Sequence, residues 1–124
     1  MSQAWQVRLA EQAELDFLGI ATWTTQHFGQ AQAELYVETI LLAMEALHDG
    51  PDPLGAKVRD DIGPGIRTLH VSRLGRKGRH FVVFMAGQGR CIDVLRLLHD
   101  SMDLARHVPT ENNPPGEWLR SRGD

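Results

Sequence analysis

The 124-residue chain is 42% hydrophobic and 23% charged, which is typical of one water-soluble globular domain with a single core. No apolar run approaches the ~20 residues that span a bilayer, and the first ten residues lack the basic start and apolar block of a signal peptide. The single cysteine, Cys91, excludes an internal disulfide and suits a reducing compartment. We therefore expect a cytoplasmic protein.

The net charge of −3 is unevenly divided along the chain. Residues 1–56 carry eight acidic side chains and one basic side chain, whereas residues 57–107 carry ten basic and five acidic ones. Such a division bears on partners rather than on fold. The first half would repel nucleic acid, and the second half is suited to an anionic surface. Ordinary solvated charge on separate elements is the alternative interpretation.

The apolar pattern predicts a strand followed by two helices. Residues 5–10 alternate between apolar and polar side chains, as a half-buried strand does. Apolar residues then recur at helical spacing over residues 11–28 and again over residues 30–48. Gly29 suits the left-handed position that follows a helix. We expect the two helices to form a hairpin.

The second half of the chain predicts a loop and three strands. Residues 51–64 show no periodicity. Strands are expected at 66–73, 79–86 and 91–99. The order strand, helix, helix, strand, strand, strand predicts an α+β fold, with a helical hairpin packed on a small, mainly antiparallel sheet. Residues 110–124 are rich in Pro and Asn, so we expect a domain over residues 1–109 and a flexible tail over residues 110–124.

Both predicted helices carry a second apolar set away from the first. In the first helix it includes Leu15 and Leu18, and in the second helix Leu35 and Leu42. One interpretation is that these residues pack against each other within the hairpin. The other is that part of this face is a docking groove for a partner.

Several kinds of active site are disfavoured by the motifs. The GPG and GQG stretches are turn signals rather than phosphate-binding loops. The histidines lack the spacing of metal ligands, so neither a metal nor another cofactor is predicted. Ser72 and Ser101 stand in no nucleophile context.

Arg67, Arg96 and His99 remain as candidates on or beside the predicted sheet. A metal-free nuclease needs histidine to transfer protons and cations to stabilise the charge that develops on the phosphate. The odd spacing of Arg96 and His99 places them on opposite faces unless a bulge or the strand end intervenes. Covering the edge of a sheet is the alternative role of such side chains.

Three stretches together resemble the ParE toxins of the RelE/ParE superfamily. Residues 94–109, VLRLLHDSMDLARHVP, resemble the ending of these toxins. Residues 61–67, DIGPGIR, resemble the loop into the second strand, and residues 7–20, VRLAEQAELDFLGI, resemble the opening strand and first helix. The resemblance covers about residues 5–109 and implies the fold of that superfamily.

The resemblance implies a toxin that a ParD-like antitoxin holds inactive by docking on the helical hairpin. ParE-type members trap DNA gyrase on cleaved DNA, whereas RelE-type members cleave mRNA on the ribosome with basic residues and a Tyr or His near the C-terminal end. Tyr36 is the only tyrosine and lies on the second predicted helix. The chain therefore has no catalytic Tyr near its C-terminal end. Its overall acidity is also unusual for a protein that enters a ribosomal RNA site, where phosphate contacts dominate affinity, so we favour the ParE branch.

The resemblance assigns two surfaces. The antitoxin would contact the second apolar set, namely Leu15, Leu18, Leu35 and Leu42. The target would contact the basic strand-and-turn region, namely Arg67, Arg73, Arg76, Lys77, Arg79, Arg96 and His99. In the alternative, an mRNA endonuclease, Arg67 and Arg96 stabilise charge and His99 transfers a proton. A third interpretation is an inactive adaptor whose toxin surface has decayed.

Overall fold

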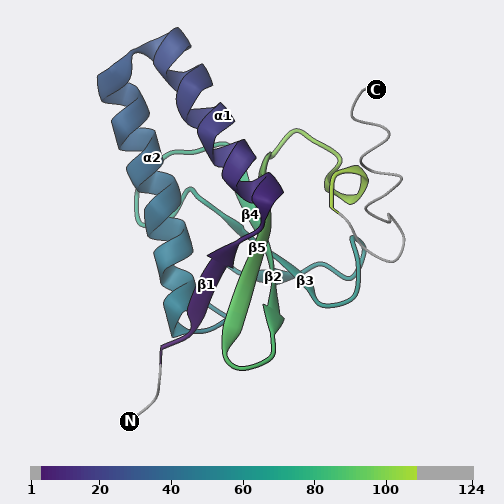
Figure 1. Ribbon diagram of the computed structural model, residues 1–124. Coiled ribbons are helices and arrows are strands. Elements are labelled where there is room, and N and C mark those ends of the chain that lie inside the picture. Colours follow the sequence, from purple (N-terminus) through teal and green to yellow (C-terminus); the bar gives the residue numbers. More distant parts are fainter. Residues whose placement is uncertain (1–3, 109–124) are drawn as a thin grey trace.

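The computed structural model describes residues 4–108, in which a helical hairpin packs on a five-stranded sheet (Figure 1). The helices are α1 (Glu11–Phe28) and α2 (Gln30–Glu45), and the strands are β1 (Gln6–Leu9), β2 (Lys57–Val58), β3 (Ile66–His70), β4 (His80–Gly87) and β5 (Cys91–His99). Short 3₁₀ turns, η1 (Ala46–Asp49) and η2 (Leu104–Arg106), follow α2 and β5. The strand order is β1-β5-β4-β3-β2, with β1 parallel to β5 and every other pair antiparallel.

Each face of the sheet has its own core. On the face covered by the hairpin, Ile40 and Leu47 pack with Phe84, Ile92 and Val94 of the two central strands. On the other face, the loop before β3 and the turn η2 cover the sheet, and the residues buried there are Ile62, Ile66, Val83, Leu98, Leu104 and Val108. Complete burial of one such side chain stabilises the fold by about 1.5–3 kcal/mol. The sheet is therefore held from both sides, and β4 and β5 lie between the two cores.

The junction of the two helices is set by Gly29. Its φ of 92° is costly for a residue with a Cβ atom, and its N–H donates to the carbonyl of Thr25, which closes the last turn of α1. The same residue precedes the first turn of α2. The chain therefore reverses within one residue, and the two helices lie side by side (Figure 1).

The structure confirms the predicted fold class, shifts the ends of β1 and β4 by one residue, and differs more in three places. The second helix ends at Glu45 rather than at His48 and continues as η1. The predicted loop contains the two-residue strand β2, which is too short to show a periodic pattern. The strand predicted at 66–73 ends at His70, because Ser72 folds back to bond with the His70 ring. The predicted tail, 110–124, lies outside the described residues.

Neither helix of the described range has an apolar stretch long enough to cross a membrane.

Candidate functional site

A groove of about 860 Å³ lies where the helical hairpin meets the start of β4 and the end of β5. Its apolar lining comes mostly from α1, with Leu15, Ile20, Trp23 and Phe28. Trp23 and Phe28 are 54% and 64% exposed. Two large aromatic side chains exposed in one concave surface are unusual for a surface that only faces water. The groove is therefore the candidate site.

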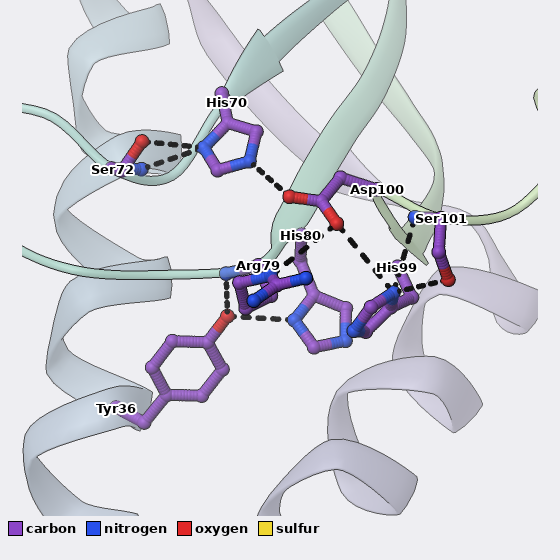
Figure 2. A network of polar contacts seen from close by, with 8 residues as sticks. All are labelled: Tyr36, His70, Ser72, Arg79, His80, His99, Asp100 and Ser101. Atoms are coloured by element: carbon purple, nitrogen blue, oxygen red, sulfur yellow. Dashed lines mark hydrogen bonds and ion pairs between the residues drawn. The ribbon is translucent and has the colours of Figure 1, made fainter.

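One end of the groove is polar and is built from Tyr36, His80 and His99 (Figure 2). The Tyr36 hydroxyl lies 2.6 Å from Nδ1 of His80 and accepts the backbone N–H of Arg79 at 2.9 Å. Burial, and next the neighbouring His99, lower the pKa of His80 to about 4. His80 is thus neutral at pH 7, and its Nδ1 shares a hydrogen bond with the Tyr36 hydroxyl. Burial also raises the pKa of Tyr36, which keeps the phenol protonated.

Gly78 allows Tyr36 to approach the chain before β4 this closely. A Cβ atom at Gly78 would lie 2.3 Å from Cγ2 of Val71 and 3.2 Å from Cε1 of Tyr36. The first distance is far below van der Waals contact. A side chain at this position would therefore push apart α2 and the segment that carries Arg79 and His80.

Two histidines end their strands with the same local bond pattern. At the end of β3, Nδ1 of His70 accepts the backbone N–H and the hydroxyl of Ser72. At the end of β5, Nδ1 of His99 accepts the same two groups of Ser101 (Figure 2). In a neutral ring the proton must then sit on Nε2. The local sequence His-x-Ser thus fixes the tautomer of both rings.

Asp100 links these two histidines to Arg79. Its carboxylate accepts the Nε2–H of His70 at 3.0 Å and lies 3.5 Å from Nε of Arg79 and 3.6 Å from Nδ1 of His99. The bond from His70, and after it the charge of Arg79, lower the pKa of the Asp100 carboxyl. The ring of His99 packs edge-on against His80, with centroids 5.3 Å apart. Within the described residues, Nε2 of His80 and Nε2 of His99 have no hydrogen-bond partner.

Arg96 is engaged in a buried ion pair. Its Nε and Nη2 donate to the two carboxylate oxygens of Asp16 at 2.7 and 2.9 Å, and its Nη1 donates to the carbonyl of His107 at 2.9 Å. The two side chains are only 10% and 13% exposed. The backbone N–H of Leu97 also donates to Asp16. Arg96 therefore ties α1 to β5 and to the segment after η2.

Arg96 and His99 lie on opposite faces of β5, as their odd spacing predicts, although both border the groove: Arg96 pairs with Val83, which packs in the core under η2. The His99 side chain lies on the same face of β5 as that of Leu97, which packs in the core under the hairpin. Arg96 lies beyond Val94, the last residue of β5 that pairs with β1. Among residues 4–108 no strand covers that edge, so the Arg96 side chain reaches Asp16 on α1.

The other predicted target residues are dispersed. Arg67 forms an ion pair with Asp52 and does not line the groove, so the three proposed nuclease residues are not gathered. Arg76 pairs with Glu38 at 2.9 Å, and Arg73 lines a second, smaller depression. Lys77 and Arg79 line the polar end of the groove and are exposed.

The four predicted antitoxin contacts are all exposed. Leu15, Leu18, Leu35 and Leu42 are 48%, 61%, 55% and 41% exposed, which is incompatible with a packed seam inside the hairpin. Leu15 lines the groove, Leu42 lines the second depression, and the other two line neither. Sequence reasoning missed this part of the groove, because the helical spacing of Ile20 and Phe28 indicated core and Trp23 was assigned to neither apolar set.

Sequence reasoning also missed the pairing of Tyr36 with His80 and of His80 with His99. The second pairing had only a partial signal: the turn opposes Gly87 to Cys91, and counting back along both strands brings His80 opposite Leu98, one residue short of His99. A one-residue bulge after Val94 supplies the difference. In the described range, no cluster of three or more His, Cys, Asp or Glu side chains could hold a metal ion. What the groove offers is apolar area, the neutral His80 with His99 beside it, and two exposed cations.

The arrangement of a helical hairpin on a mixed five-stranded sheet is the fold of RelE and ParE toxin subunits. The chromosomal ParDE toxin–antitoxin system from P. aeruginosa matches with a TM-score of 0.64 and 21% identity, over 79% of this chain and 98% of that chain. The toxin–antitoxin complex RelBE2 from Mycobacterium tuberculosis matches with a TM-score of 0.50 and 15% identity, over 77% and 98%. At such low identities, these two structures support the fold alone.

The family follows from the sequence itself. The family model described as the ParE toxin of type II toxin–antitoxin systems, parDE, matches residues 7–104. The chain therefore belongs to the ParE toxin family. No curated protein matches the sequence.

Proposed function

We propose that this ParE-family toxin acts by binding DNA gyrase and stabilising its cleaved-DNA intermediate, and that an antitoxin of the ParD type neutralises it in the cytoplasm. We favour a binding protein over a nuclease because Arg96 is held in a buried ion pair with Asp16. A guanidinium that is already bonded to a carboxylate and a carbonyl cannot also stabilise a developing phosphate charge without breaking those bonds. Arg67 lies outside the groove altogether.

The target surface we propose is the exposed part of the basic region. Lys77 makes no ion pair among residues 4–108, and the Arg79 side chain is 72% exposed. His99 lies beside them at the end of β5. Arg67, Arg76 and Arg96 also belong to the predicted surface, but each is paired with an acidic side chain. The first group would therefore contribute more to target binding than the second.

The antitoxin surface we propose is the exposed apolar area of the hairpin. Leu18 and Leu35 are more than half exposed, and the P. aeruginosa match is described as a ParDE system. The variants Leu18→Glu and Leu35→Glu should each weaken antitoxin capture by about tenfold or more, because a charge replaces a buried contact. Titration calorimetry measures the affinity. Unchanged affinity in both variants would reject this assignment.

The experiment that tests the target is a plasmid assay with purified DNA gyrase, with and without a ParD-type antitoxin. Accumulation of linear, protein-linked DNA that the antitoxin prevents is the expected result. The variant with Lys77→Glu and Arg79→Glu should lose this activity. A matched control is Lys57→Glu on the edge strand β2, which should keep it. Intact supercoiling at every toxin concentration would contradict the gyrase proposal.

A ribosome-dependent mRNA endonuclease is the second candidate, and the pairing of His80 with His99 favours it. Two imidazole rings 5.3 Å apart, beside Lys77, are suited to moving a proton to and from a sugar hydroxyl. Cleavage of mRNA on purified ribosomes by the chain, and its loss in His99→Gln, would establish this function instead. Growth arrest upon expression without antitoxin separates both functions from an inactive adaptor.

A further inference from the structure

The connection between β3 and β4 carries an exposed leucine at a position that disfavours leucine. The backbone N–H of Arg76 donates to the carbonyl of Arg73 at 2.9 Å, which closes a four-residue turn around Leu74 and Gly75. Both central residues have positive φ, 53° for Leu74 and 82° for Gly75. Such a turn favours asparagine followed by glycine, because a larger side chain is strained at positive φ. Leu74 is nevertheless 90% exposed, so its side chain adds little to the packing of the fold.

The turn is held against α2 by Arg76. The Arg76 side chain donates to the hydroxyl of Thr39 at 2.8 Å and to the carbonyl of Leu35 at 3.3 Å, and it pairs with Glu38 at 2.9 Å. A strained backbone conformation persists only where the surrounding contacts impose it, and contacts of this kind are suited to that task. They anchor the end of the turn that follows Leu74, so the exposed leucine is presented at a defined position beside α2.

Leu74 lines the second depression, which has a volume of about 330 Å³. The other apolar residues of its lining are Leu42, Ala43, Ala46 and Val71. An apolar cavity of about 150 Å³ already accommodates a molecule of the size of benzene, so this depression has room for a leucine side chain. An exposed leucine at a depression that can receive a leucine makes the surface complementary in shape to a second copy of itself.

The charges around the depression have both signs and do not pair within the described chain. Glu45, Asp49 and Arg73 belong to the lining and form no ion pair among residues 4–108. Arg73 makes one long hydrogen bond, 3.5 Å, to a backbone carbonyl, and Arg76 is already bonded to α2. A partner of a single charge sign would oppose like charges at one part of this surface. A second copy of the chain supplies both signs, because a two-fold axis brings the cation of each copy to the acidic side chains of the other.

We propose that two copies of the chain associate through this surface, with Leu74 of each copy inserted into the second depression of the other. Each contact of a two-fold interface occurs twice, so Arg73 of one copy meets Glu45 and Asp49 of the other. The apolar contact supplies affinity, and the ion pairs fix the register of the two copies. The surface is small, so we expect a weak dimer with a Kd on the order of 10–100 µM. The second depression shares no lining residue with the groove, so the dimer does not depend on what binds there.

The test is sedimentation equilibrium of the purified full-length chain over roughly 2–500 µM, where the average mass should rise from one chain towards two. Leu74→Asn should weaken the association by about tenfold or more, because it removes the inserted side chain. Asparagine tolerates positive φ, so this variant should keep or raise the denaturation midpoint, which separates loss of association from loss of folding. The matched control is Leu18→Asn, at an exposed leucine outside the depression, which should associate as the original chain does.

Charge reversal then tests the two-fold arrangement. A chain with Arg73→Glu carries only acidic side chains at the unpaired positions, and a chain with Glu45→Lys and Asp49→Lys carries only basic ones. Each chain alone should associate about tenfold more weakly than the original, because like charges then face each other across the axis. An equimolar mixture of the two should recover the original association to within about twofold, since every contact again joins opposite charges.

Several results would overturn the proposal. They are a mass of one chain at every concentration, association that Leu74→Asn leaves unchanged, and charge-reversed chains whose mixture associates no better than either chain alone. A chain that stays monomeric but loses antitoxin capture in Leu74→Asn would assign the depression to the antitoxin instead. The proposed function is judged separately, because a monomeric chain that still traps gyrase on cleaved DNA would contradict the dimer alone.

Discussion

Arg96 and Lys77 are two cations of the same predicted surface, and the fold uses them in opposite ways. Arg96 is held at one side of the groove by Asp16 and the carbonyl of His107, with 10% of its side chain exposed. Lys77 lies at the polar end, is exposed and has no ion pair among the described residues. The sequence displays both as positive charge, but only the second is available to a partner.

The comparison separates a structural end of the groove from a binding end. A buried ion pair gains little over an apolar pair of the same shape, yet breaking it leaves an unpaired charge in a poorly solvated place. An exposed lysine contributes little to folding and keeps its charge for another molecule. The comparison predicts large changes in stability at the first end, and changes in binding with little change in stability at the second.

The largest expected effect on stability is that of Arg96→Ala. It leaves the buried carboxylate of Asp16 without its bidentate partner, so the free energy of unfolding should fall by about 3–5 kcal/mol. Urea denaturation followed by circular dichroism measures this change. The matched control is Lys77→Ala, for which we expect less than about 0.5 kcal/mol. Similar losses of unfolding free energy in the two variants would contradict the distinction between a structural end and a binding end of the groove.

The next effect is that of Gly78→Ala. The added methyl group would meet Val71 at 2.3 Å, and relief of that clash moves the chain away from Tyr36. We expect a loss of about 1–3 kcal/mol in the free energy of unfolding, as in other overpacked sites. The change in the denaturation midpoint measures it. An unchanged midpoint would mean that the close approach of Tyr36 is not needed for the fold.

Most of the fold could be predicted from the sequence because local patterns determine it. The bounds of α1 were predicted correctly, since its apolar spacing is regular and Gly29 ends it. The strand β5 was also placed correctly, although Arg96 interrupts its apolar pattern. The end of β3 was misplaced because a side-chain bond, from Ser72 to His70, decides it. Patterns of polarity carry no information on such a bond.

The site was harder to predict because it is formed by residues distant in sequence. Tyr36 and His80 are 44 positions apart, and Arg96 and Asp16 are 80 apart. Whether a charged residue is available depends on such partners, which no spacing rule identifies. Phe28 shows the converse error, since its helical spacing indicated core whereas it is exposed in the groove. Apolar periodicity alone does not distinguish burial in a core from burial under a partner.

The pH dependence of stability tests whether His80 is as desolvated as the groove geometry implies. Its pKa is about 4 in the folded chain, against 6.5 for an unperturbed histidine. Between these values the unfolded chain binds more protons, so the stabilisation is complete above pH ~6.5 and is lost as the pH falls towards ~4. The lowered pKa of Asp100 acts below this range. Denaturation midpoints measured from pH 7.5 to 4 should fall.

The control for this pH profile is a pair of histidine variants. His80→Gln should flatten the decline between pH 6.5 and 4, whereas His27→Gln, at an exposed position near the end of α1, should leave it unchanged. A decline of equal size in both variants would place the titrating group elsewhere and remove the argument that His80 is neutral at the polar end.

The smallest expected change in stability is that of Gly19→Ala, and its sign is the informative part. A methyl group at this position meets nothing within 4 Å, so the gain in helix propensity should raise the free energy of unfolding by about 0.5–1 kcal/mol. Gly19 also lines the groove, so a backbone that packs against α1 there meets the added methyl group, and antitoxin affinity should fall. Urea denaturation and calorimetry on one variant would then change in opposite directions. A variant that is more stable and is captured with undiminished affinity would mean that no backbone approaches α1 at this point, and that the glycine has no role in binding.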